Sequence, residues 1–209
     1  MRVLAINTVG SSCEAALIDG EAEWVVVEPM ARGHDARVAA IAEQAREKSG
    51  LDWTDLDRIA VVCGPGSFTG VRVGVSFARG LGLALEIPVI GVTSLEALNP
   101  TPPPGPTLGA LAAKKRPPGR SWWTQRLLNG AGAGACEETA EADLPAAWAG
   151  AVAILGDDAF PVPPCLAPIV AEPSALAAAR FARTVDPAAH PPHAIYAREP
   201  DAAPMKGLS

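Results

Sequence analysis

The spacing of apolar residues changes along the first hundred positions and predicts strands before helices. Short apolar runs at residues 3–6, 13–18 and 23–28 are separated by turn-forming residues, and Asp19-Gly20 is a hairpin signal. We therefore expect three strands joined by short turns in an antiparallel meander.

Helical spacing replaces this pattern from residue 33 onward. Four apolar residues between positions 33 and 48 fall on one helical face: Val38, Ile41, Ala42 and Ala45. The elements predicted next are a strand at 58–63, a glycine-rich turn at 64–70, a helix at 71–85, a strand at 88–92 and a short helix opened by a capping box at 93–96. The order β-β-β-α-β-α-β is typical of the ribonuclease-H-like half of actin-like and sugar-kinase-like proteins. A dinucleotide-binding fold would alternate strand and helix from its start.

A proline-rich stretch then predicts a domain boundary. Residues 99–106 hold five prolines, which lack the N–H donor that helices and interior strands need. We expect residues 1–98 to form the first lobe, 99–106 a linker, and 107–209 a smaller, divergent second lobe with a frayed tail. The elements expected in the second lobe are strands at 107–113, 121–128 and 151–155 and a helix at 174–184 capped by Ser174.

Composition narrows the class of protein. The net charge of -6 argues against a protein that binds nucleic acid by itself, because phosphate binding depends on Lys and Arg. The four cysteines contain no C-x-x-C pair, which favours reduced thiols in a cytosolic protein. Neither a signal peptide nor an apolar run of membrane-spanning length is visible, so we expect a cytoplasmic location and no membrane contact.

The strongest local motif is the glycine-rich turn between a predicted strand and a predicted helix. It lacks the lysine of a phosphate-binding Walker loop, the acidic residue of a dinucleotide fingerprint and the glycine spacing of a serine-nucleophile elbow. Two interpretations stay open: a tight turn packed between lobes, or an anion loop at a helix N-terminus. The residues predicted for an anion loop, together with the first turn of the chain, are Asn7, Thr8, Gly64, Gly66, Ser67 and Thr69. Asn7 is neutral, so it can form hydrogen bonds but cannot supply the negative charge that holds a metal or accepts a proton.

The helix at 71–85 carries small residues at a spacing of four. Gly74, Ala78 and Gly82 share one face, although glycine costs about 1 kcal/mol relative to alanine inside a helix. Such a face packs closely either on the protein's own sheet or on a partner. We predict a partner surface formed by Gly74, Val75, Ala78, Leu81 and Gly82, with His34 and Arg37 of the first helix.

The remaining candidate residues do not form a catalytic or metal site. The three histidines are too few and too scattered for a metal, and no Ser-His-Asp or Cys-His set can be assembled. One basic cluster with neighbouring tryptophans, Trp122 and Trp123, is either a solvated hairpin or an RNA contact. Its basic residues are Lys114, Lys115, Arg116 and Arg120.

Two motifs carry a resemblance to a known family. Residues 63–74 read Cys-Gly-Pro-Gly-Ser-Phe-Thr-Gly-Val-Arg-Val-Gly, and residues 90–95 read Ile-Gly-Val-Thr-Ser-Leu. Together with the start of the chain they resemble the TsaB (YeaZ) family over residues 1–98, with weaker matches at 154–157 and 194–198. The chain departs from the family pattern at Asn7, where the family has aspartate. It also departs at 111–116, where the family's aspartate is missing.

The resemblance implies an α/β, two-lobed, actin-like (ASKHA, ribonuclease-H-like) fold whose mixed sheet begins with the meander. It also implies a non-catalytic subunit that pairs with TsaD, together with the ATPase TsaE, for threonylcarbamoyl transfer to the tRNA adenosine beside the anticodon. The expected partners are therefore TsaD and TsaE, a second copy when the protein is alone, and tRNA through the complex. We expect no intrinsic cofactor, and ATP or ADP binding only weakly or in the complex. The alternatives are an autonomous ATP-using transferase or kinase of the same fold, and an RNA-contacting module. The family's grouping with glycoprotease-like (peptidase M22) proteins finds no support in the residues.

Overall fold

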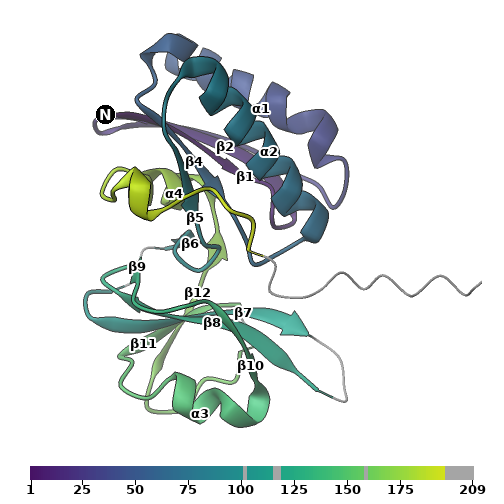
Figure 1. The fold of residues 1–209 in the computed structure, drawn as a ribbon. Coiled ribbons are helices and arrows are strands. Elements are labelled where there is room, and N and C mark those ends of the chain that lie inside the picture. Colours follow the sequence, from purple (N-terminus) through teal and green to yellow (C-terminus); the bar gives the residue numbers. More distant parts are fainter. Residues whose placement is uncertain (101–102, 115–118, 158–159, 196–209) are drawn as a thin grey trace, which may run out of the picture.

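The computed structural model describes residues 1–100, 103–114, 119–157 and 160–195, and Figure 1 shows them arranged as two lobes. The predicted C-terminal tail, residues 196–198 of the weaker family match, residues 101–102 of the predicted linker and residues 115–118 lie outside the described residues.

The first lobe is built on a five-stranded mixed sheet. Its strands lie in the order β3-β2-β1-β4-β5, with β1, β2 and β3 antiparallel and β1, β4 and β5 parallel. The bounds are β1 (Arg2–Asn7), β2 (Ser12–Asp19), β3 (Ala22–Pro29), β4 (Arg58–Val62) and β5 (Val89–Val92). The meander and the two crossovers predicted from the sequence are confirmed.

Helices cover both faces of this sheet. The helices α1 (His34–Ser49) and α2 (Phe68–Leu85) lie side by side on one face, with the short η1 (Trp53–Asp55) between α1 and β4. The helix α4 (Ala175–Ala182) packs on the other face, against β1, β2 and β4. The apolar residues expected on one face of α1 are buried in the core, as the 3.6-residue spacing predicts.

The second lobe contains a six-stranded sheet, in which five strands lie in the order β10-β8-β7-β11-β12 and β9 pairs with β8. The bounds are β7 (Pro106–Lys114), β8 (Ser121–Leu128), β9 (Ala131–Gly132), β10 (Glu137–Ala140), β11 (Ala153–Gly156) and β12 (Ala167–Val170). The turn η2 (Glu141–Asp143) and the helix α3 (Leu144–Ala147) cover one face of it. The predicted strands at 107–113, 121–128 and 151–155 are confirmed within two residues.

The predicted extent of the second lobe needs correction. The chain crosses between lobes twice, and the crossings pair as a short ladder of β6 (Leu98–Asn99) and β13 (Glu172–Pro173). After the second crossing, α4 joins the core of the first lobe through Ala175, Ala178, Ala179 and Ala182. Residues beyond about 171 thus return to the first lobe, because the sheet there needs a helix on its second face.

A final segment follows η3 (Pro187–Ala189) and runs along the edge of β5. The Gly91 N–H donates to the carbonyl of His190 at 2.9 Å, and the Ile195 N–H donates to the carbonyl of Cys63 at 2.8 Å. The segment thereby pairs with an edge strand that would otherwise present open backbone groups. In the described part of the chain, no helix combines the length and the apolar character needed to cross a membrane.

Candidate functional site

The glycine-rich turn between β4 and α2 packs against the turn between β1 and β2. A Cβ on Gly66 would lie 2.8 Å from the Cβ of Val9, and one on Gly70 would lie 2.0 Å from the carbonyl oxygen of Thr8. The Ser67 N–H donates to the carbonyl of Val9 at 3.1 Å. The two turns therefore need glycine because their backbones touch. This close contact agrees with the interpretation of residues 64–70 as a tight, packed turn.

The polar groups of these turns are largely engaged within the protein. Asn7 is 1% exposed, accepts from the Val9 N–H at 3.1 Å and donates to the carbonyl of Pro173 at 2.9 Å. The Thr8 hydroxyl donates to the carbonyl of Gly70 at 2.7 Å. The Ser67 hydroxyl caps α2 by accepting from the Gly70 N–H at 3.3 Å.

The predicted anion loop therefore needs correction at three residues. Asn7, Thr8 and Gly64 are buried, so they cannot contact a ligand in this conformation. Gly66, Ser67 and Thr69 stay exposed at the start of α2. The resemblance to actin-like proteins predicts that the two turns lie together, but it does not show that their polar groups bond within the protein.

A cleft of about 370 Å³ opens between the lobes at these turns. The first lobe contributes Val9, Gly10, Ser11, Ser12, Pro65, Gly66 and Ser67, and the rest of the chain contributes Leu111, Ala112, Ala113, Trp123, Asp157, Glu172 and Pro173. Among the described residues of this lining, two carry a carboxylate and none is basic. Carboxylates at this position oppose the approach of a phosphate. Across the described ranges, no group of three or more His, Cys, Asp or Glu residues is arranged to hold a metal that could offset their charge.

The small-residue face of α2 points inward, contrary to the predicted partner surface. A Cβ on Gly74 would lie 2.4 Å from the Thr8 hydroxyl oxygen, and one on Gly82 would lie 2.2 Å from Cγ2 of Val89. Ala78 between them is 0% exposed. The helix uses these positions to approach its own β1–β2 turn and β5.

Other members of the predicted partner surface are divided between the core and the surface. Val75 and His34 are buried, and Nε2 of His34 has no hydrogen-bond partner among the described residues. Leu81 is half-buried. Arg37 reaches the surface and pairs with Glu28, with Nη2 and Oε2 2.6 Å apart. This hydrogen bond lowers the pKa of the Glu28 carboxyl and raises that of Arg37.

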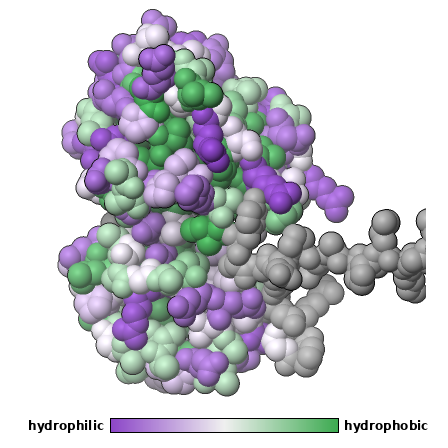
Figure 2. Space-filling model, in the orientation of Figure 1, coloured by the Kyte–Doolittle hydropathy of each residue, from purple (hydrophilic) through white to green (hydrophobic). Residues whose placement is uncertain are grey.

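The outward face of α2 is formed by other residues than the small-residue face, and it combines apolar with basic side chains. Leu83 is 82% exposed, and a Cβ on the neighbouring Gly80 would meet no atom within 4 Å. The other outward residues are Arg72, Ser76, Arg79 and Ala84, with Val73 and Phe77 half-buried beside them. Figure 2 shows apolar side chains beside strongly hydrophilic ones on this side of the first lobe. A shallow groove of about 590 Å³ runs beside Leu83, between α2 and Pro192 of the final segment.

Comparison with known proteins identifies the family. The family model described as tRNA N6-adenosine threonylcarbamoyltransferase (TsaD) matches residues 24–108. The tRNA threonylcarbamoyladenosine biosynthesis protein TsaB of Escherichia coli is 40% identical over 95 residues, which are 46% of this chain and 41% of that one. The uncharacterized protein Rv3421c of Mycobacterium tuberculosis is 34% identical over 208 residues, covering 97% of this chain and 94% of that one. The chain belongs to the TsaB (YeaZ) family.

Solved structures show that the family fold extends through both lobes. A Pseudomonas aeruginosa protein described as similar to peptidase YEAZ superposes with a TM-score of 0.70 at 24% identity, covering 94% of this chain and 99% of that one. YeaZ from the same organism gives a TM-score of 0.66 at 22% identity. The α/β, actin-like fold expected for a TsaB-family chain is thus confirmed. The sequence match to E. coli TsaB, by contrast, spans less than half of that protein.

The basic and aromatic cluster of this TsaB-family chain does not present its rings for stacking. Trp122 is 2% exposed and packs edge-on against Phe160, with ring centroids 5.6 Å apart. Trp123 is also buried and lines the interlobe cleft. Arg120 lies over the Trp122 ring at 5.0 Å and pairs with Glu141 at 3.5 Å.

The two tryptophans are therefore too buried to stack on RNA bases, as the predicted RNA contact would require. Lys115 and Arg116 lie outside the described residues, and so does the side chain of Lys114.

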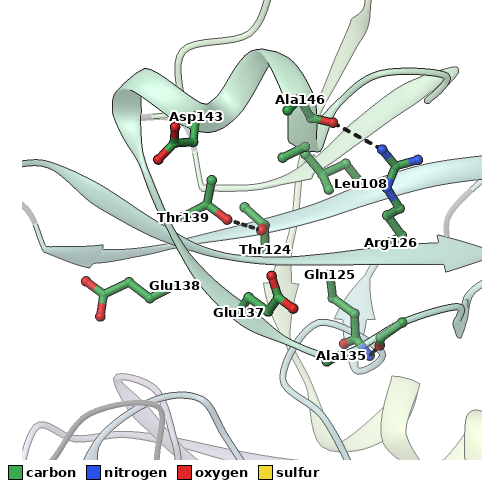
Figure 3. A pocket seen from close by; sticks show the side chains of 12 residues that line it. Leu108, Thr124, Gln125, Arg126, Ala135, Glu137, Glu138, Thr139, Asp143 and Ala146 are labelled. Carbon is green, nitrogen blue, oxygen red and sulfur yellow. Dashed lines mark hydrogen bonds between the residues drawn. The ribbon is translucent and has the colours of Figure 1, made fainter.

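One hollow in the second lobe was not predicted from the sequence. It measures about 480 Å³ and lies between α3, β8 and β10 (Figure 3). On its wall, the hydroxyls of Thr124 and Thr139 are 2.6 Å apart, and Nη2 of Arg126 donates to the carbonyl of Ala146 at 3.1 Å. Among the described residues that line it, the acidic Glu137 and Asp143 outnumber the one guanidinium, which disfavours phosphate.

Proposed function

We propose that this protein is a non-catalytic subunit of the machinery that makes threonylcarbamoyladenosine in tRNA, and that it pairs with a TsaD-type catalytic subunit. The names of its TsaB relatives support the pathway, and the TsaD family model matches the part of the chain that contains α1 and α2. A TsaE-type ATPase completes the proposed set, and tRNA is contacted through the complex. The place of action would be the cytoplasm.

The single observation that supports the non-catalytic role is that the Asn7 side chain forms its hydrogen bonds within the protein. An actin-like phosphotransferase needs an acidic group at this loop to hold a metal, whereas Asn7 is neutral, buried and bonded to both Val9 and Pro173. The Glu172 carboxylate at the cleft adds a negative charge that opposes nucleotide phosphates. We therefore propose that the protein acts by binding its partner and not by turning over ATP.

The outward face of α2 is the surface we propose for the partner. A TsaD-type subunit has a related first lobe, and two related lobes can pair about a pseudo-twofold axis by using the same helices on both sides. Leu83 supplies an exposed apolar anchor, and Gly80 leaves room for close approach of a partner backbone. In the absence of that partner, the same face would pair two copies of this chain.

The test is co-purification of the tagged protein with the TsaD-type subunit of its own cell, using Leu83→Arg and the matched control Leu128→Arg. Both leucines are exposed, at 82% and 52%, but Leu128 lies on the second lobe. We expect Leu83→Arg to abolish pairing and Leu128→Arg to preserve it. Equal pairing by both variants would overturn the assignment of this face.

Calorimetry with ATP and magnesium distinguishes the proposed non-catalytic subunit from an autonomous transferase or kinase of the same fold. We expect no tight binding of ATP with magnesium to the protein alone. Tight binding, together with turnover by the lone chain, would contradict the non-catalytic role.

A further inference from the structure

A partly buried polar cluster joins the two lobes beside the chain crossings. The chain turns at Thr93–Glu96 directly after β5, and both bonds of the predicted capping box form. The Thr93 N–H donates to Oε2 of Glu96, and the Glu96 N–H donates to the Thr93 hydroxyl, each at 3.0 Å. The box closes a single turn and not the short helix that the sequence predicts.

The second lobe supplies the remaining partners of this box. Oε1 of Glu96 accepts from the N–H of Gly132 on β9 at 3.0 Å. The Thr93 hydroxyl donates to Oε1 of Gln125 on β8 at 2.8 Å, and Nε2 of Gln125 donates to the carbonyl of Gly134 at 3.1 Å. Glu96 is 9% exposed and Gln125 is 5% exposed, whereas Thr93 is half-buried and Gly132 is exposed, so these bonds are partly shielded from water.

The packing around the cluster leaves little freedom. A Cβ on Gly132 would lie 2.5 Å from Nε2 of Gln125 and 2.6 Å from Oε1 of Glu96. Leu95, in the same turn, is fully buried, and its Cδ2 would lie 3.1 Å from a Cβ on Gly109 of β7. The turn thus packs against the sheet of the second lobe through Leu95. It lies next to the β6–β13 ladder, which is formed by the two chain crossings.

We propose that Thr93, Glu96, Gln125 and Gly132 form an interlobe latch that holds the two lobes in one orientation. Hydrogen bonds to a carboxylate are stronger than those between neutral groups, and a network whose side chains bond one another selects one arrangement of its members. The latch lies where a hinge between the lobes would have to bend. The interlobe cleft therefore keeps a fixed width, and the protein presents its surfaces as one rigid body.

The test compares Gly132→Ala with the matched control Gly134→Ala. Gly132 ends β9 and Gly134 lies two residues later in the β9–β10 connection, where an added Cβ meets nothing within 4 Å. Spin labels on the exposed Cys165 of the second lobe and on an introduced Glu21→Cys in the first lobe report the interlobe distance. Mass spectrometry confirms that only these two thiols are labelled.

We expect one narrow distance for the parent and for Gly134→Ala. For Gly132→Ala we expect a broad or two-peaked distribution, with other distances populated roughly tenfold more than in the parent. A folded Gly132→Ala protein with the parent distribution would overturn the latch.

A second pair of variants covers the case in which Gly132→Ala does not fold. Glu96→Gln keeps the side-chain shape but turns an amide N–H₂ group toward one of the backbone donors. Asp55→Asn makes the same change in the capping box of η1, where Asp55 accepts from the Asp52 N–H at 2.8 Å. Broadening by Glu96→Gln alone supports the latch, and an unchanged distance in both variants contradicts it.

Discussion

Gly74 and Gly80 lie in the same helix but differ in what surrounds them, and this difference makes a sharp prediction. A Cβ on Gly74 would lie 2.4 Å from the Thr8 hydroxyl oxygen and 3.5 Å from Cγ2 of Val61. A Cβ on Gly80 would meet no atom within 4 Å. Alanine at both positions therefore tests which face of α2 belongs to the core.

The expected effects have opposite signs. Replacing a glycine inside a helix by alanine stabilises the helix by about 1 kcal/mol, which is the whole effect expected for Gly80→Ala. In Gly74→Ala the same gain is opposed by overpacking, which costs about 1–3 kcal/mol. It is also opposed by disturbance of the buried bond from Thr8 to Gly70, which costs about 1 kcal/mol. The net loss is about 1–3 kcal/mol, so the two variants should differ by roughly 2–4 kcal/mol.

Urea unfolding, followed by circular dichroism and tryptophan fluorescence, measures the difference as a shift in midpoint at constant slope. We expect Gly80→Ala to unfold at higher urea than the parent and Gly74→Ala at lower urea. Equal or reversed midpoints would refute the inward orientation of the small-residue face and would return Gly74 to the surface.

Three further predictions concern the surface, the lobe junction and the thiols. Leu83→Arg should change the free energy of unfolding by no more than about 0.5 kcal/mol, as measured by urea, while it abolishes pairing. Asn7→Asp, which places aspartate where the family usually has it, should destabilise by about 1–3 kcal/mol in the same assay. A carboxylate cannot donate to the Pro173 carbonyl, so parent-like stability would contradict the reported bond. Burial raises the pKa of the Cys63 thiol to about 12 from 9.0, so iodoacetamide at neutral pH should modify the exposed Cys165 and spare Cys63 until the protein unfolds. Because the folded pKa of Cys63 is the higher one, its contribution to stability is complete below pH 9 and declines as the pH rises toward 12.

The first lobe could be predicted from the sequence because its elements are regular and local. Residues 3–6, 13–18 and 23–28 are apolar runs bounded by turn residues, and each became a strand of the meander. Ser174 was recognised as a helix cap, and it accepts from the Ala177 N–H at 3.1 Å. What the sequence could not show is that α4 crosses back to the first lobe, since periodicity gives a helix an apolar face without saying which sheet it covers.

The candidate site was predicted less completely, for a related reason. A stripe of small residues such as Gly74, Ala78 and Gly82 indicates close approach of another backbone, but it does not say whose. The structure supplies the chain's own Thr8 and Val89 as the neighbours. Ala78 is 0% exposed, so we expect Ala78→Arg to unfold the protein. This variant therefore cannot test whether α2 contacts a partner.

The role we propose for this protein is that of a non-catalytic partner of a TsaD-type subunit in the formation of threonylcarbamoyladenosine. The most direct measurement is tRNA modification by the purified TsaD- and TsaE-type subunits of the same cell, with and without this protein, alongside co-purification. We predict stable pairing, loss of modification when this protein is omitted or carries Leu83→Arg, and no modification by this protein alone. Full modification in its absence, or turnover by the lone chain, would contradict the account.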